Sequence, residues 1–299
     1  MKFNTSFAPH HGEAVEVAEG VLRVTAPNPS PFTFYGTNSY IVGAHTLAVI
    51  DPGPADDSHL QTLLRAINGR PVSHILISHT HRDHSPLGRL LAEATGAIVL
   101  AEGPHRAARE IRLGEGQRLD ASGDLDFRPD RALVDQQVVE GDGWGLRAVF
   151  TPGHAANHVA YALEGTGILF SADHVMGWAT TIVAPPDGSM RDYMASLDRL
   201  LERDDRLYLP GHGGPIRKPA AFVRGLRAHR RMRERAILER VAQGDRTIPE
   251  IVAAIYRDTD PRLFGAAGLS VFAHLEDLVA RAAVATDGLP TLEGEFRPG

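Results

Sequence analysis

The chain has 299 residues, of which 43% are hydrophobic and 23% charged, and its formal net charge at pH 7 is −6. This composition is typical of a folded globular protein with one large domain or two, and it argues against a disordered chain or a membrane-spanning helix. The sequence contains no cysteine, which excludes disulfides, thiolate metal ligands and a cysteine nucleophile together.

Residues 1–25 mix charges with short apolar pieces and lack the continuous apolar core of a secretory signal, so we expect a cytoplasmic protein. Over the first two thirds of the chain, short β-branched runs alternate with turn signals and helical stretches, which predicts layered α/β construction. Strands are expected at Tyr40–Val42, Leu47–Ile50, Ile75–Ser78, Ala97–Leu100, Leu146–Phe150, His158–Leu163, Gly167–Ser171 and Leu207–Leu209. Helices are expected between them, including one with Ser85 as its N-cap, Pro86 in its first turn and Gly96 at its end.

From about residue 219 the pattern changes to helices only. Three helices are expected there, followed by a short hairpin within the final LPTLEGEF stretch. The first runs over Phe222–Gly244, the second follows a capping box at Thr247–Glu250, and the third lies near Ser270–Ala283. This change divides the chain into two predicted domains, residues 1–218 and residues 219–299.

The stretch SHTHRDHS crowds three histidines and an aspartate, His79, His81, Asp83 and His84, into six positions. Such imidazoles would repel one another once protonated, and burial without partners would be costly, so a bound group should hold them together. In an extended segment His79, His81 and Asp83 would face one point, and the turn into the next helix would bring His84 beside them. Four ligands split by a turn predict two metal ions rather than one.

Three more candidate ligands, His154, Asp173 and His212, each follow a predicted strand, where loops gather at one edge of a sheet. The two histidines could complete two ligand sets, and Asp173 could bridge the ions with one carboxylate. His158 and His174 are the nearest rivals, and we interpret them as structural; His154 is preferred because it directly follows a Pro-Gly turn. Asp51, in VIDPG, is either a group that hydrogen-bonds a ligand or a simple turn residue.

The joint pattern His79-x-His81-x-Asp83-His84, Pro-Gly-His154, Asp173 and Gly-His212 resembles the metallo-β-lactamase-fold hydrolases. That resemblance implies an α/β fold, a four-layer αβ/βα sandwich with a binuclear site at its edge. It places His79, His81 and His154 on one metal, Asp83, His84 and His212 on the other, and Asp173 between them. The tail, with HRRMRERAIL, TIPEIVAAIY and LSVFAHLEDL, resembles the winged-helix-like C-terminal domain of a lactamase-β-like subgroup related to glyoxalase II and single-strand endoribonucleases.

These residues predict a hydrolase in which a metal-bridging hydroxide attacks a small ester, thioester or lactone, while Asp83 orients the hydroxide or relays its proton. Crowded histidines favour two zinc ions, although manganese or iron would suit a mixed imidazole and carboxylate site nearly as well. The lack of cysteine excludes the β-lactamase classes that use a cysteine ligand.

Two other functions stay open at this stage. The segment Arg224–Arg235 carries six arginines against a single acid, Glu234. Such a run is usually a solvated helix face, but it could steer the phosphates of single-stranded RNA into the site of an endoribonuclease. The third hypothesis is a metal-sensing regulator whose helical tail binds DNA. The expected partner is therefore a small-molecule substrate or single-stranded RNA, and no membrane.

Overall fold

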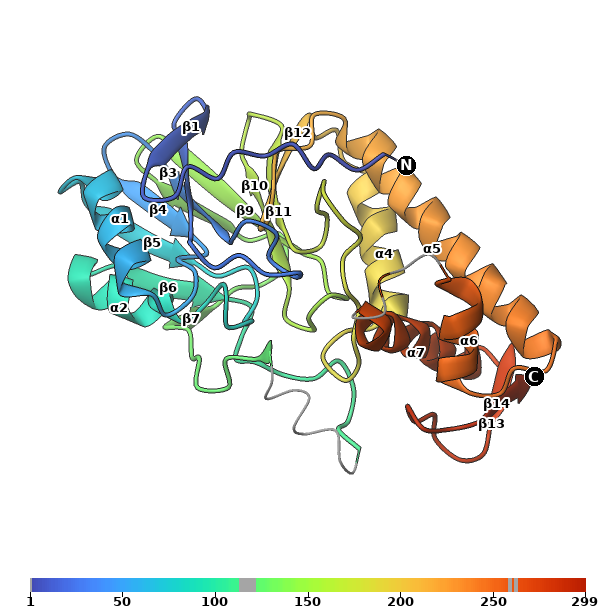
Figure 1. Cartoon of the computed structure of the whole chain (residues 1–299). Coiled ribbons are helices and arrows are strands. Elements are labelled where there is room, and N and C mark those ends of the chain that lie inside the picture. Colours follow the sequence, from blue (N-terminus) through green and yellow to red (C-terminus); the bar gives the residue numbers. More distant parts are fainter. Residues whose placement is uncertain (1, 113–121, 258–259, 261–262) are drawn as a thin grey trace.

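The computed structural model describes residues 2–112, 122–257, 260 and 263–299. Two β-sheets form its centre, and helices cover their outer faces (Figure 1). The first sheet has the order β1-β2-β3-β4-β5-β6-β7, and its strands are Ala14–Ala18, Val21–Thr25, Asn38–Val42, Leu47–Ile50, Val72–Leu76, Ile98–Ala101 and Arg131–Ala132. The second has the order β12-β11-β10-β9-β8, with β8 at Val138–Gly141, β9 at Trp144–Phe150, β10 at Val159–Leu163, β11 at Ile168–Ala172 and β12 at Leu207–Pro210.

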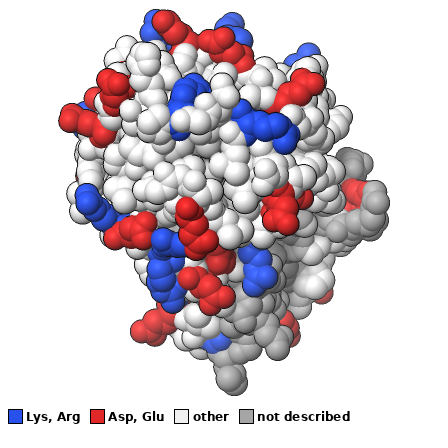
Figure 2. All heavy atoms as spheres, turned by 90° about the vertical axis from the view of Figure 1, so that its left-hand side faces the viewer, with Lys and Arg blue, Asp and Glu red and all other residues white. Residues whose placement is uncertain are grey.

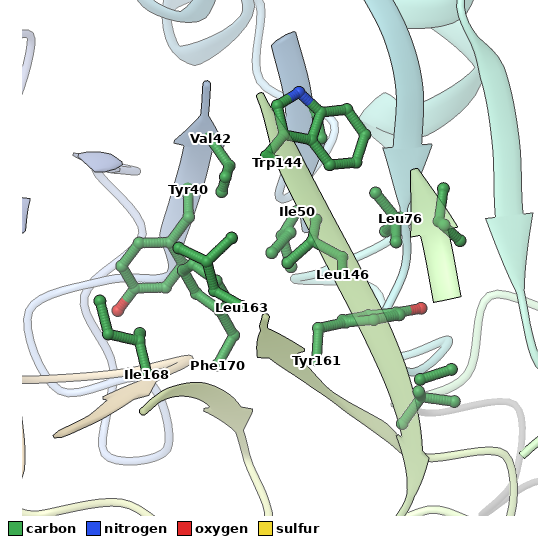
Figure 3. Close-up of a cluster of buried hydrophobic side chains, with 14 of the residues drawn as sticks. Tyr40, Val42, Ile50, Leu76, Trp144, Leu146, Tyr161, Leu163, Ile168 and Phe170 are labelled. Atoms are coloured by element: carbon green, nitrogen blue, oxygen red, sulfur yellow. The ribbon is translucent and has the colours of Figure 1, made fainter. Parts of the chain in front are cut away.

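Side chains alternate across the strands, which is why the two sheets can pack face to face. Tyr40 of β3 points into the core between the sheets, where it meets Phe170 of β11 at a ring distance of 5.1 Å (Figure 3). Ile41 points to the opposite face and packs in a cluster with Leu63 and Leu91, from helices α1 (Asp57–Ile67) and α2 (Leu87–Thr95).

The outer face of the second sheet is covered by helices α4 (Met190–Leu201) and α5 (Pro219–Ala242). Leu169 of β11 packs in one cluster with Tyr193 of α4 and Leu226 of α5. Helix, sheet, sheet and helix therefore form four layers, which confirms the predicted αβ/βα sandwich.

The C-terminal part consists of α5, α6 (Ile248–Ile255), α7 (Phe264–Ala280) and a small hairpin of β13 (Val284–Thr286) and β14 (Phe296–Pro298). These elements share a second apolar core that includes Ile237, Ile251, Phe272 and Phe296. Helix α5 belongs to both cores, because its first half packs on α4 and its second half on α6 and α7. The division into residues 1–218 and 219–299 stays a prediction.

The structure differs from the sequence predictions at several boundaries. Ser85 is not the N-cap of α2: Pro86 takes that position, and the Ser85 hydroxyl instead donates to Asp124 (2.7 Å). Strand β5 was predicted to extend to Ser78, but it ends at Leu76. The backbone N–H of Ser78 donates to the Asp51 carboxylate (2.7 Å) rather than to a neighbouring strand.

In the C-terminal part, the predicted hairpin stretch 289–296 is mainly the connection between β13 and β14, and α7 begins well before residue 270. The capping box is confirmed, because the Glu250 carboxylate accepts a hydrogen bond from the Thr247 N–H (2.9 Å). Within the described part of the chain, none of the helices combines the length and apolar character needed to cross a bilayer.

Candidate metal centre

The seven residues predicted as ligands lie together at one edge of the sandwich. Strand β5 runs parallel to β4 and β6, and β11 runs parallel to β12, so the carboxyl ends of neighbouring strands point the same way. The loops that follow these strands and β9 therefore meet. They carry His79, His81, Asp83 and His84 (after β5), His154 (after β9), Asp173 (after β11) and His212 (after β12).

Three imidazoles converge in what we name the first ligand set: His79, His81 and His154. The Nε2 atom of His79 lies 3.0 Å from Nδ1 of His81, and Nε2 of His154 lies 3.1 Å from the same Nδ1 atom. One ring nitrogen of each residue thus faces a common point, within the spacing that a single metal ion requires.

The second ligand set consists of Asp83, His84 and His212. Oδ2 of Asp83 lies 3.3 Å from Nε2 of His84 and 3.2 Å from Nε2 of His212. Asp173 stands between the sets: its Oδ2 is 3.2 Å from Nε2 of His212 and 3.6 Å from Nε2 of His154. A carboxylate so placed can contact two ions at once.

The extended geometry expected for the histidine cluster is wrong in one respect. The chain turns at this point, and the backbone N–H of His84 donates to the carbonyl of His81 (2.9 Å). That turn separates Asp83 from His79 and His81 and places it with His84 and His212. Alternation along a strand could not have predicted this, because the cluster is not in a strand.

The outward nitrogen of every imidazole in the two sets has a hydrogen-bond partner. The partners are Ser78 Oγ for His79 (3.0 Å), Asp187 Oδ2 for His81 (2.6 Å), the Ile182 carbonyl for His154 (2.7 Å), Asp51 Oδ2 for His84 (2.9 Å) and the Gly36 carbonyl for His212 (3.2 Å). Carbonyls and carboxylates only accept, and the Ser78 hydroxyl already donates to Asp51 (2.6 Å), so each outward nitrogen is the N–H donor. In the neutral form of each ring, the inward nitrogen then carries the lone pair that metal ligation requires.

Inward lone pairs about 3 Å apart repel one another unless a cation lies between them. A cation is also needed between two buried atoms, Nε2 of His84 and Oδ1 of Asp173. They lie 3.5 Å apart, and neither has a hydrogen-bond partner. The cation can be a proton or a metal ion. Imidazole nitrogens and carboxylate oxygens suit zinc, manganese or iron, so the residues present fit the predicted metals.

The imidazoles of the two sets differ in their affinity for protons. Burial lowers the pKa of His79 well below its usual value and that of His154 to about 4, so both rings are neutral at pH 7. Burial also opposes a charge on His212, but the carboxylates of Asp173 and Asp83 outweigh it and raise the pKa to about 9. The pKa of His84 is raised for the same reason. In the first set, burial also opposes a charge on His81, but the Asp187 carboxylate outweighs it and raises the pKa of this ring. Metal ions would therefore compete with protons at His81 as well as at both histidines of the second set.

Asp51 and Asp187 support the ligands, and sequence reasoning identified only the first as a candidate. Asp51 holds His84 and, through Ser78, also His79, so it is more than a turn residue. Asp187 was not predicted, because it lies in an Asp-Gly pair after two prolines, a pattern typical of any turn. Its contact with His81 joins positions 106 residues apart, which no local pattern encodes.

The two rival histidines, His158 and His174, are buried close to the ligands but belong to neither set. Nδ1 of His158 lies 2.8 Å from the Thr151 hydroxyl, and the His174 ring lies 4.5 Å from that of Tyr193. Burial lowers the pKa of His174 to about 3, so this ring stays neutral as a structural group. The interpretation of both histidines as structural stays a prediction.

The predicted basic patch at Arg224–Arg235 is not one solvent-facing surface. Arg230 is only 3% exposed, Arg227 is paired with Asp198 on α4 (2.5 Å), and Arg233 lies over the Tyr256 ring (4.6 Å). Three arginines of the run stay exposed: Arg224, Arg231 and Arg235. Figure 2 shows a different face of the molecule, the one with α1 and α2. Positive and negative side chains are interspersed there, as on an ordinary solvated surface.

Comparison with known proteins gives two family matches. The model of the metallo-beta-lactamase superfamily matches residues 32–212, and that of the beta-lactamase associated winged helix domain matches residues 247–289. Both ligand sets and Asp173 lie within the first range.

Similar proteins cover most of the chain. A Drosophila melanogaster protein, named beta-lactamase-like protein 2 homolog, is 29% identical over 88% of both chains. A Claviceps purpurea protein, named atrochrysone carboxyl ACP thioesterase, is 30% identical over 87% of this chain and 79% of its own. The crystal structure of a beta-lactamase domain protein from Burkholderia ambifaria has the same fold, with a TM-score of 0.81 and 22% identity over 98% of this chain and 95% of that one.

Gly211 leaves no room for a side chain between the two ligand sets. A Cβ atom there would lie 2.3 Å from Oδ1 of Asp173 and 2.8 Å from Cε1 of His84. We expect Gly211→Ala to displace both side chains and to lower the zinc content of the purified protein, measured by elemental analysis. Gly265→Ala is the control, because a Cβ there meets nothing within 4 Å. Equal zinc content in the two variants would contradict this account of the site.

The raised pKa of His212 makes the stability of the metal-free protein depend on pH. Its pKa is about 9 in the fold, against about 6.5 for an unperturbed histidine. The stabilisation that protonated His212 gives to the folded protein is therefore complete below about pH 6.5, and it is lost as the pH rises towards 9. In urea titrations, metal-free wild type should lose free energy of unfolding over this range, and His212→Asn should lose less. His45→Asn, at an exposed histidine, should follow wild type; a wild-type slope in His212→Asn would refute the assignment.

Proposed function

The chain belongs to the metallo-β-lactamase superfamily of metal-dependent hydrolases, and from this premise we propose that it hydrolyses a small acyl thioester with two divalent metal ions. The observation that carries the proposal is the inward convergence of ring nitrogens whose outward nitrogens are all occupied. Zinc is the metal that this donor set favours. His79, His81 and His154 would hold one ion, Asp83, His84 and His212 the other, and Asp173 would contact both.

Two such ions would lower the pKa of a bound water towards neutrality and polarise the carbonyl group under attack. The protein's own residues supply position. Each imidazole is fixed by its outward hydrogen bond, so the inward atoms cannot rotate away while the reaction proceeds. The site therefore needs little reorganisation as charge develops.

Asp83 is the residue best placed to handle the proton. Its side chain is 26% exposed, against 12% or less for His81, Asp173 and Asp187. The site is thus open to solvent at Asp83, where the substrate must enter. The Thr37 hydroxyl donates to Oδ2 of Asp83 (3.3 Å) and helps to fix its orientation. Asp83 can therefore orient the attacking water and accept its proton.

An aromatic cluster lies beside this open edge and favours an apolar acyl group. We name it the aromatic rim: Phe34, Tyr35 and Trp178. The Phe34 and Trp178 rings stack at 4.7 Å, and Tyr35, 42% exposed, meets the edge of Phe34 at 4.3 Å. The rim adjoins His212 on two sides, because Gly36 accepts the hydrogen bond of that ring and a Cβ on Gly213 would meet Trp178 at 2.9 Å.

Two observations favour a thioester over the other substrates considered. One similar protein is named as an acyl-carrier-protein thioesterase, and the aromatic rim offers an apolar contact for an acyl group. The ribonuclease hypothesis loses support, because three of the six arginines in the Arg224–Arg235 run are engaged within the protein. The regulator hypothesis needs a metal site without catalysis, whereas Asp83 opens this site to solvent and substrate.

We expect zinc-loaded protein to hydrolyse an aromatic acyl thioester, with the released thiol followed by a thiol reagent. A chelator should abolish the activity, and zinc should restore it. Asp83→Asn should lower kcat about 100-fold or more, because the amide cannot accept the proton and is a weaker metal ligand than the carboxylate. Asp142→Asn, an exposed aspartate in the turn between β8 and β9, should leave kcat unchanged.

A simple lactone and single-stranded RNA should be assayed in parallel with the thioester. The proposal expects the thioester to be the best of the three by kcat/KM. Metal-loaded protein that cleaves the RNA, and leaves the thioester intact, would overturn it.

A further inference from the structure

Arg230 is a buried cation at the contact between α5 and the sandwich. Its side chain is 3% exposed, and its guanidinium donates to the Thr181 carbonyl and to the Ser270 hydroxyl (3.4 Å). It also lies over the Tyr193 ring, 5.1 Å from its centre. Among the described residues, these hydrogen-bond and ring partners are all neutral. Burying a charge is costly when no carboxylate pairs with it. The hydrogen bonds and the ring contact must therefore offset the cost of burying the Arg230 guanidinium.

The Thr181 contact leads directly to the metal centre. The Thr181 hydroxyl donates to the backbone carbonyl of Asp173 (2.7 Å). The carbonyl of the next residue, Ile182, is the partner that fixes the outward nitrogen of His154 (2.7 Å). One peptide segment thus touches Arg230 on one side and two candidate ligands on the other.

The Tyr193 contact reaches the same two ligands by a second route. The Tyr193 hydroxyl donates to the carbonyl of His174, the residue after Asp173 (3.1 Å). The backbone of Tyr193 packs against Gly153, the residue before His154, so closely that a Cβ atom there would lie 2.3 Å from its Cα. Gly153 also has a φ of 139°, which other residues rarely adopt.

We propose that Arg230 is a positioning residue through which the C-terminal helices complete the metal centre. By holding the Thr181 carbonyl and the Tyr193 ring, it fixes the backbone at Asp173 and the ring of His154. The helical part of the chain would then set the metal affinity of a site whose ligands all lie in the sandwich. This inference rests on the metal centre of the proposed function.

The test compares zinc affinities, measured by competition with a chromophoric chelator, for Arg230→Met and Arg227→Met in the full chain. Arg227 is the matched control, because it also joins α5 to α4, but its ion pair is with Asp198 and not with the segment 173–182. Arg230→Met should bind zinc about tenfold more weakly, the lower end for loss of a group behind a metal ligand. Arg227→Met should stay within about twofold, as for a partly exposed ion pair.

Two further variants separate positioning from general stability. Arg230→Lys keeps the charge near the Thr181 carbonyl and should recover part of the lost affinity. Thr181→Val removes only the hydroxyl that holds Asp173 and should weaken zinc binding even if Arg230→Met fails to fold. The cobalt-substituted protein should show a changed visible spectrum in Arg230→Met and Thr181→Val, and an unchanged one in Arg227→Met.

The outcomes distinguish this inference from the proposed function. Wild type that binds no zinc would overturn the metal centre itself. Wild type that binds zinc tightly, together with Arg230→Met or Thr181→Val of unchanged affinity and cobalt spectrum, would overturn the role of Arg230 alone. Equal losses in Arg227→Met and Arg230→Met would also overturn it, because the effect would then belong to the α4–α5 contact in general.

Discussion

The structure depends on one constraint: ring nitrogens that face one another at about 3 Å must share a cation. In the first ligand set, His79, His81 and His154 have their outward nitrogens committed to acceptors, so three inward nitrogens meet at one point and need a proton or a metal ion between them. The rest of the fold keeps these nitrogens in place. Two sheets end at the same edge, their loops bring distant parts of the chain together, and buried partners such as Asp51 and Asp187 prevent the rings from turning away.

The same constraint applies to the second ligand set, where the cation can be a proton or a metal ion. At the second ligand set, carboxylates raise the pKa of His84 and His212, so a metal ion would compete with protons for these rings. Asp83 is the one ligand with a substantially exposed side chain, so chemistry is confined to that edge. The aromatic rim adjoins His212, and in our proposal Arg230 of α5 holds the segment behind Asp173 and His154. The proposed metal centre, its solvent-exposed edge and the contact of α5 with the sandwich thus lie close together.

Much of this could be predicted from the sequence, because the ligands occur in short motifs. SHTHRDHS and the Pro-Gly-His turns follow recognisable strands, so their residues and a layered α/β construction could be predicted, whereas the four-layer sandwich was implied by the family resemblance. The partners behind the ligands were not, since Asp187, Ile182 and Gly36 reach the histidines across long sequence separations. The arginine run shows the same limit. Its charge is visible in the sequence, but the burial of Arg230 depends on packing between α5, α4 and α7.

The most direct test of the account is an anomalous diffraction measurement on crystals of the zinc-loaded protein, collected at the zinc edge. The account predicts two peaks. One should lie among the inward nitrogens of His79, His81 and His154, and the other among Asp83, His84 and His212, with an Asp173 oxygen within reach of both. A single peak, or zinc bound away from these inward atoms, would contradict it.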